Sequence, residues 1–190
     1  NTFTDGDVIF SQEYCYKVKA VYEDGESNPT NEECGNVIDP ADFSVIGIED
    51  GLVQSGMDLS ISVELENQFD IAGFQFTLVD TPNLLSVMSA VTTDRTDGFT
   101  INFNEQLDGS VIFVAFSLTG DVISAGEGPI LDLIFSAEQV AEDITIEVSI
   151  EDYYLGDSLG NEIPIYAESG TVVISTESIS ETLSIELEPF

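Results

Sequence analysis

Hydrophobic and polar side chains alternate with a period of two residues between Asp58 and Asp80. Every second position is hydrophobic, with Leu59, Ile61, Val63 and Leu65 before a polar break and Phe74, Phe76 and Leu78 after it. This is the period of a β-strand that buries one face, and it excludes a helix here. We therefore expect two successive strands of one sheet, with a second sheet covering their hydrophobic face as in a sandwich.

Similar patterns extend this expectation over most of the chain. Strands are predicted at residues 43–48, 58–66, 72–80, 85–92, 99–105, 111–117, 130–136, 144–150, 162–167 and 170–175. Turn-forming dipeptides separate them at Asp97-Gly98, Asp108-Gly109, Gly120-Asp121 and Gly156-Asp157. The only helix candidate is a turn or so near residues 137–141. Many short strands with almost no helical periodicity predict an all-β sandwich.

Residues 1–38 form a separate group of three expected strands, at 2–10, 14–22 and 31–38. In the middle strand Tyr14, Tyr16 and Val18 are expected to point inward, and Cys15, Lys17 and Lys19 outward. The run YCYKVKAVYEDGESNPTNEEC resembles the final strands of a fibronectin type III domain, with Tyr14 in the place of that family's tyrosine corner. Three strands leave a sheet face open. Either the segment is cut from a larger protein, or another chain or copy supplies what is missing.

The two cysteines flank a predicted hairpin turn at Asp24-Gly25. With that dipeptide at the centre of the turn, positions whose numbers add to 49 face each other, and Cys15 then faces Cys34. We expect a cross-strand disulfide, which is typical of an extracellular or cell-surface protein; a pair of buried thiols is the alternative.

The order of segments from Ala41 to Ser175 resembles the cohesin family. The resemblance rests on SISVELEN, IAGFQFTLVD, LLSVMSAV, PILDLIFSA and SGTVVIS, in that order. It implies a jelly-roll β-sandwich that binds dockerin modules through one sheet face, without catalysis. No dockerin-contacting residue carries over, because those positions vary widely in that family. With a joint at Asp39-Pro40, the expected organisation is a partial fibronectin type III-like unit at 1–38, a cohesin-like sandwich at 39–175 and a linker with a terminal strand at 176–190.

Composition changes the picture mainly through charge. The chain has 37 acidic residues against Lys17, Lys19 and Arg95, which gives a formal net charge of −34. Phosphate binding needs clustered Lys and Arg, so nucleic acid and anionic membranes are excluded as partners. The sequence contains no run of about 20 apolar residues, which is the pattern that would indicate membrane insertion. A surface this acidic suits a saline or calcium-containing medium, in which ions screen its charge. The alternative is that the acidic residues only keep the protein soluble.

The side chains available for chemistry argue against an enzyme. The chain has no histidine, which removes Ser-His and Cys-His nucleophile systems. Calcium is the one cofactor that the composition favours, because hard cations take several oxygen ligands. The best candidate ligands are Asp152, Asp157, Asn161 and Glu162, and weaker pairs are Asp5 with Asp7 and Asp94 with Asp97. The alternative is that these acidic turns are only solvated.

The segment 176–190 begins as a Ser/Thr/Glu linker and ends in another alternating pattern, in which Leu183, Ile185 and Leu187 share one face. It is either a linker to a further module or a strand donated to the edge of another subunit. The resulting prediction is a non-catalytic extracellular structural or adhesive subunit that assembles with copies of itself, as a filament or other homopolymer. The alternative is a dockerin-binding cohesin module of a secreted or cell-surface scaffold.

Overall fold

The computed structural model describes residues 4–9, 12–37 and 43–177. The chain divides into two compact units, Asn1–Phe43 and Ser44–Phe190, which are described separately. No helix among the described residues is long and apolar enough to span a membrane. The expected joint at Asp39-Pro40 and the expected donor residues Leu183, Ile185 and Leu187 lie outside the described residues.

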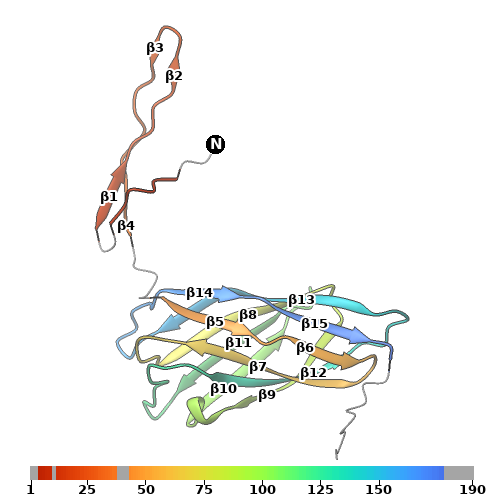
Figure 1. Ribbon diagram of the computed structural model, residues 1–190. Coiled ribbons are helices and arrows are strands. Elements are labelled where there is room, and N and C mark those ends of the chain that lie inside the picture. The colour runs from red at the N-terminus through yellow and green to blue at the C-terminus, as the bar shows by residue number, and fades with distance from the viewer. Residues whose placement is uncertain (1–3, 10–11, 38–42, 178–190) are drawn as a thin grey trace, which may run out of the picture. The chain divides into compact units, whose positions relative to one another are not determined.

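The second unit is a sandwich of two β-sheets (Figure 1). The six-stranded sheet has the order β10 (Phe99–Glu105), β11 (Val111–Ser117), β8 (Gly73–Thr81), β13 (Ile144–Gly156), β15 (Gly170–Ser175) and β6 (Gly51–Gln54). The five-stranded sheet has the order β14 (Ile165–Glu168), β5 (Ser44–Ile48), β7 (Asp58–Glu66), β12 (Pro129–Ala137) and β9 (Leu85–Thr92). Strands β14 and β6 pair in parallel with β5 and β15. This confirms the predicted all-β, jelly-roll β-sandwich.

The core lies between the inner faces of the two sheets. Phe76, Phe113 and Phe135 are fully buried there, and the rings of Phe76 and Phe113 stack with centroids 5.0 Å apart. Burying a side chain of this size contributes roughly 1.5–3 kcal/mol relative to leaving it in water. The alternating pattern read from the sequence therefore corresponds to the inner surface of the sandwich.

One part of that reading is wrong, because β7 and β8 are not neighbours in one sheet. Strand β7 lies in the five-stranded sheet and β8 in the six-stranded sheet. The segment between them crosses from one layer to the other and is held by bridges from Asn67 to Gly126 and from Ile71 to Ile123. An alternating pattern identifies the buried face of each strand but not its neighbour, and the polar break is long enough to span the roughly 10 Å between packed sheets.

Three other elements differ from the sequence prediction. Strand β6 was not predicted, because Gly51 and its short hydrophobic run gave no alternation. Strand β13 continues past Ile150 to Gly156 through a bulge. The helix expected near 137–141 does not form: Ala137 is the last residue of β12, and hydrogen bonds from the Ala137 N–H to the Met57 carbonyl and from the Glu138 N–H to the Leu84 carbonyl hold the segment against other parts of the sandwich. In the described chain the only helical turn is η2 (Asp94–Thr96).

The first unit, here called the arm (described residues 4–9 and 12–37), is a narrow ribbon. Strand β1 (Glu13–Tyr16) pairs with β4 (Glu33–Asn36), and β2 (Val21–Tyr22) pairs with β3 (Gly25–Glu26). Residues 4–9 form no strand, contrary to the expectation for 2–10. The expected inward orientation of the aromatic residues is also wrong, because no residue of known exposure in the arm is buried. A two-stranded ribbon has no second layer to pack against.

The arm places Cys15 directly opposite Cys34, as the sequence indicated, but the turn is not where it was expected. Residues Glu23 and Asp24 form the turn, so Tyr22 faces Gly25. The registers of the two ladders therefore differ. The returning strand therefore has extra residues between the two ladders. In this stretch the hydroxyls of Ser27 and Thr30 accept hydrogen bonds from backbone N–H groups of the opposite strand, at 2.9 and 3.0 Å.

Candidate protein-binding face

The outer surface of strands β10, β11 and β8 carries no charged side chain. Inner positions such as Phe113 and Phe76 are buried, so the alternate positions point outward. We call these outward residues the neutral face: Thr100, Asn102 and Asn104 on β10, Ile112, Val114 and Phe116 on β11, and Gly73, Gln75, Thr77, Val79 and Thr81 on β8. In a chain of net charge −34, this is a distinct environment.

The register of the sheet places these residues in rows across the strands. One row is Asn102, Val114, Gln75 and Tyr154, and the next is Asn104, Ile112, Thr77 and Glu151. Phe116 is 38% exposed and Tyr154 is 40% exposed. Apart from Glu151, which borders the neutral face on β13, the rows combine aliphatic and aromatic side chains with amides and hydroxyls, which is the composition of the centre of a protein interface.

A bulge in β13 brings Tyr154 into this surface. The pairing shifts between Glu151 and Tyr154, so Tyr154, and not Tyr153, lies opposite Gln75. Asp152, within the bulge, has a φ of 45°, in the left-handed region. Bulges of this kind redirect a side chain. Here the bulge adds an aromatic ring at the edge of the neutral face.

A shallow depression of about 360 Å³ lies beside Tyr154. Its lining includes Gly73, Val114, Tyr154 and Gly160. A Cβ atom at Gly73 would lie 3.0 Å from the Ala115 carbonyl oxygen, so a larger residue would disturb the adjoining strand. The depression is open and partly apolar, and it can receive a side chain from a protein docked on the neutral face.

The outer surface of the five-stranded sheet is different. Acidic side chains point outward from most of its strands, at Asp58, Glu64, Glu66, Asp132 and Glu168. Burial and the nearby Glu49 carboxylate raise the pKa of Glu64. This surface repels acidic proteins, including copies of itself.

The predicted calcium ligands are not gathered into one cluster. Asp157 Oδ1 accepts hydrogen bonds from the Leu159 and Asn161 N–H groups, and Oδ2 accepts one from Asn161 Nδ2, all at 2.8 Å. These bonds, chiefly those from Asn161, lower the pKa of Asp157. Asp152 instead lines a separate acidic hollow of about 330 Å³ with Asp80 and Asp108. Glu162 lies opposite Gly156 in an isolated bridge.

Of the weaker acidic pairs, the first forms local hydrogen bonds and the second flanks a helical turn. Asp5 accepts hydrogen bonds from the Asp7 N–H (3.1 Å) and the Tyr16 hydroxyl (2.8 Å). Asp94 lies in the first turn of η2, and Asp97 is its C-cap. Calcium binding stays a prediction, and chelation at fixed ionic strength would lower the melting temperature if it is right.

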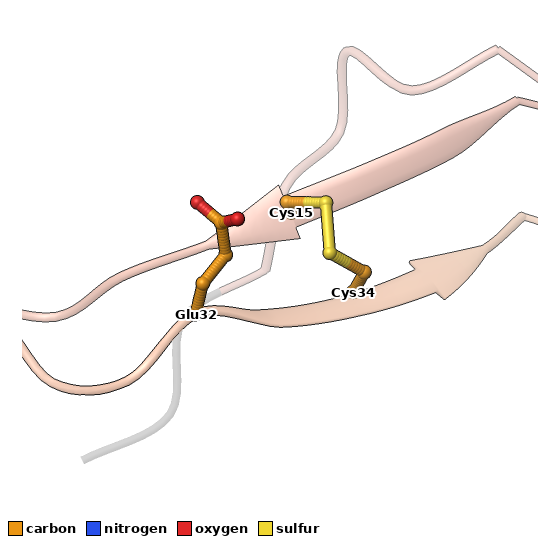
Figure 2. Close-up of side chains that lie close together, drawn as sticks. All are labelled: Cys15, Glu32 and Cys34. Carbon is orange, nitrogen blue, oxygen red and sulfur yellow. A yellow bond between two sulfur atoms is a disulfide. The ribbon is translucent and has the colours of Figure 1, made fainter.

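Among the described residues, one trio of acidic or cysteine ligand atoms lies within 4.8 Å: Cys15, Glu32 and Cys34. Figure 2 shows why it is not a metal centre: the two sulfur atoms are joined in a disulfide. Metals bind the thiolate form of cysteine, which this bond removes. The cluster is therefore a structural staple of the arm.

No protein-family model matches this sequence, and no curated protein matches it. Solved structures match by fold. The sixth cohesin of Acetivibrio cellulolyticus scaffoldin B, in complex with a dockerin, has a TM-score of 0.60 and 22% identity over 70% of this chain and 99% of its own. A type I cohesin–dockerin complex of Clostridium thermocellum has a TM-score of 0.61 and 17% identity, with the same coverage.

A non-cellulosomal cohesin of the archaeon Archaeoglobus fulgidus has a TM-score of 0.57 and 19% identity, over 70% of this chain and 91% of its own. At these identities the likeness establishes the cohesin fold. The fibronectin type III-like reading of the arm stays a prediction.

Proposed function

We propose that this chain is a non-catalytic, cohesin-like module that binds another protein, and that its partner is a dockerin-type module docked on the neutral face. The observation that carries this proposal is the absence of charge from that face in a chain with 37 acidic residues. Charged residues are depleted and aromatic residues enriched at the centre of protein interfaces. The surrounding acids then orient the partner and exclude acidic competitors.

The class of partner is supported by the solved relatives in fold, two of which are bound to dockerins. The setting is supported by the disulfide between Cys15 and Cys34, because such bonds persist in oxidising compartments. We infer an extracellular or cell-surface location, with the module acting in a scaffold.

A matched pair of substitutions tests the docking face. Val114→Glu places one acid in the middle of the neutral face, and Ile134→Glu places the same acid on the outer surface of the five-stranded sheet, where Ile134 is 36% exposed. Both are β-branched residues in central strands. Binding to the dockerin-type modules encoded in the same genome is measured by titration calorimetry.

Val114→Glu is expected to weaken binding roughly 30-fold or more, as at an interface hot spot, while Ile134→Glu changes it little. Equal affinities of the two variants would assign the partner to another surface. If the unmodified chain binds none of the dockerin-type modules, the proposed class of partner is wrong.

A further inference from the structure

The three most exposed hydrophobic side chains among the described residues all border the neutral face. They are leucines at the tips of turns: Leu107 is fully exposed, and Leu159 and Leu118 are 84% and 83% exposed. A single exposed leucine is common on a protein surface and needs no explanation. Three leucines at the margin of one uncharged surface, in a chain with 37 acidic residues, indicate a surface that another molecule covers.

The turns that carry these leucines lie at the two ends of the neutral face. We call them the leucine turns: residues 106–110, which join β10 to β11, residues 117–121, at the end of β11, and residues 157–161, which follow β13. Phe116 of β11 and Gly156 of β13 both pair with Gly73, so the second and third turns lie on either side of the start of β8. The first turn lies at the other end of β11, about 20 Å away along the strand.

Hydrogen bonds within each leucine turn hold its backbone in place. In each turn one aspartate accepts them from residues of the same turn: Asp108 from the Ser110 N–H and hydroxyl, Asp121 from the Ser117 and Thr119 hydroxyls, and Asp157 from the Leu159 and Asn161 N–H groups. The backbone beneath each leucine is therefore ordered before a partner arrives. Less conformational entropy is lost on binding when the contacting segment is already ordered.

The third leucine turn is continuous with the neutral face. Gly160 of this turn lines the depression beside Tyr154, and the Tyr154 hydroxyl donates to the Gly160 carbonyl at 3.4 Å. The same depression reaches Val114, in the middle of the neutral face. A partner that covers the neutral face therefore also meets the hydrophobic tip at Leu159.

The position of the leucines constrains the chemistry of that partner. The margin of a protein interface is usually polar and in contact with water. A leucine at the margin adds affinity only where the partner covers it with apolar surface, because the gain comes from removing apolar area from water. A charged group placed against it would lose hydration without gaining a hydrogen bond.

We propose that Leu107, Leu118 and Leu159 are specificity-determining contacts for the protein that docks on the neutral face, and that this partner carries an apolar recess opposite each of them. The inference rests on the proposed function, since it names the chemistry of the partner at the same site. Two of the recesses lie at one end of the partner's docking surface, and the third lies about 20 Å away at the other end. Modules with charged residues at these positions are rejected.

Single substitutions test the proposal by titration calorimetry with the dockerin-type module that the unmodified chain binds. Leu107→Ser, Leu118→Ser and Leu159→Ser are each expected to weaken binding about tenfold, because each removes a leucine side chain from the interface. Leu159→Met keeps a hydrophobic side chain of similar size and should retain most of the affinity. Leu52→Ser is the matched control, since Leu52 is a 55% exposed leucine on β6, at the opposite edge of the same sheet, and should bind like the unmodified chain.

The outcomes separate this inference from the proposed function. Leucine variants that bind as tightly as the unmodified chain, while Val114→Glu still weakens binding, would leave the docking face in place and overturn the leucine contacts. An unmodified chain that binds no dockerin-type module overturns both proposals. Light scattering checks the remaining possibility. A mass that rises with concentration for the unmodified chain, but not for the leucine variants, would show that the leucines join copies of this chain and would overturn the inference.

Discussion

The sandwich and the arm begin from the same kind of sequence pattern but are held together in different ways. In the sandwich the alternating residues of two sheets meet, and Phe76, Phe113 and Phe135 are removed from water completely. In the arm no second sheet meets the alternating residues: the Tyr14 and Tyr16 hydroxyls form hydrogen bonds with Ile9 and Asp5, and Val18 and Val21 stay mostly exposed. The comparison shows that alternation predicts where a strand forms, whereas its stability depends on what covers the hydrophobic face. In the arm, a disulfide and two ion pairs hold the strands together in place of a buried core.

The basic side chains of the two regions also have different partners. In the arm, Lys17 and Lys19 form half-exposed ion pairs with glutamates. In the sandwich, the Arg95 guanidinium donates to three backbone carbonyls and to Asn67 Oδ1, and forms no ion pair within 4.0 Å among the described residues. Burial lowers the pKa of Arg95. Arg95 therefore connects the crossing between β7 and β8 to the loop before β12.

The largest effect is expected in the core. Phe113→Ala removes a ring that is fully buried and stacked on Phe76, and should lower the free energy of unfolding of the sandwich by about 3–5 kcal/mol. Phe116→Ala, on the same strand but 38% exposed, should lower it by less than about 1 kcal/mol. Urea unfolding followed by circular dichroism measures both. Similar losses in the free energy of unfolding for the two variants would contradict the assignment of Phe113 to the inner face of β11 and of Phe116 to its outer face.

Removing the disulfide should affect the arm alone. Replacing Cys15 and Cys34 together by serine releases a loop closed by a sequence separation of 19, which is worth roughly 3 kcal/mol in the chain-entropy model. Because the arm has no core, amide hydrogen exchange in β1 and β4 should become fast while the melting temperature of the sandwich stays the same. A lower melting temperature of the sandwich would show that the two units stabilise each other.

A smaller effect is expected at Arg95. Arg95→Met keeps much of the side-chain volume but deprives Asn67 Oδ1 and the carbonyls of a donor, and should cost about 1–3 kcal/mol. Lys19→Met, which removes a half-exposed ion pair with Glu26 in the arm, should leave unfolding of the sandwich unchanged. Both are measured by the same urea titration. An Arg95→Met chain as stable as the parent would show that water replaces the guanidinium without loss.

The sequence predicted much less of the candidate site than of the fold. Each residue of the neutral face is an ordinary uncharged residue of its own strand, whether Thr, Asn, Gln, Val, Ile, Phe or Gly. The face exists only because β10, β11 and β8 pair in a register that sets Asn102, Val114 and Gln75 side by side. The outward positions of the predicted strands, compared for charge, were the one signal in the sequence that could have indicated it. The calcium prediction relied on acidic composition, which does not specify whether carboxylates converge.

By itself, the sequence determined the local structure of the sandwich. The predicted bounds of β7, β9, β10, β11 and β15 are confirmed to the residue, because alternation and turn residues act over a few neighbouring positions. The tertiary structure alone decided that β7 and β8 lie in opposite layers, that a bulge turns Tyr154 outward, and that uncharged residues of three strands form one surface. The physical reason is that these features depend on contacts between residues far apart in the chain, and a period of two residues specifies the buried face of a strand without specifying its neighbour.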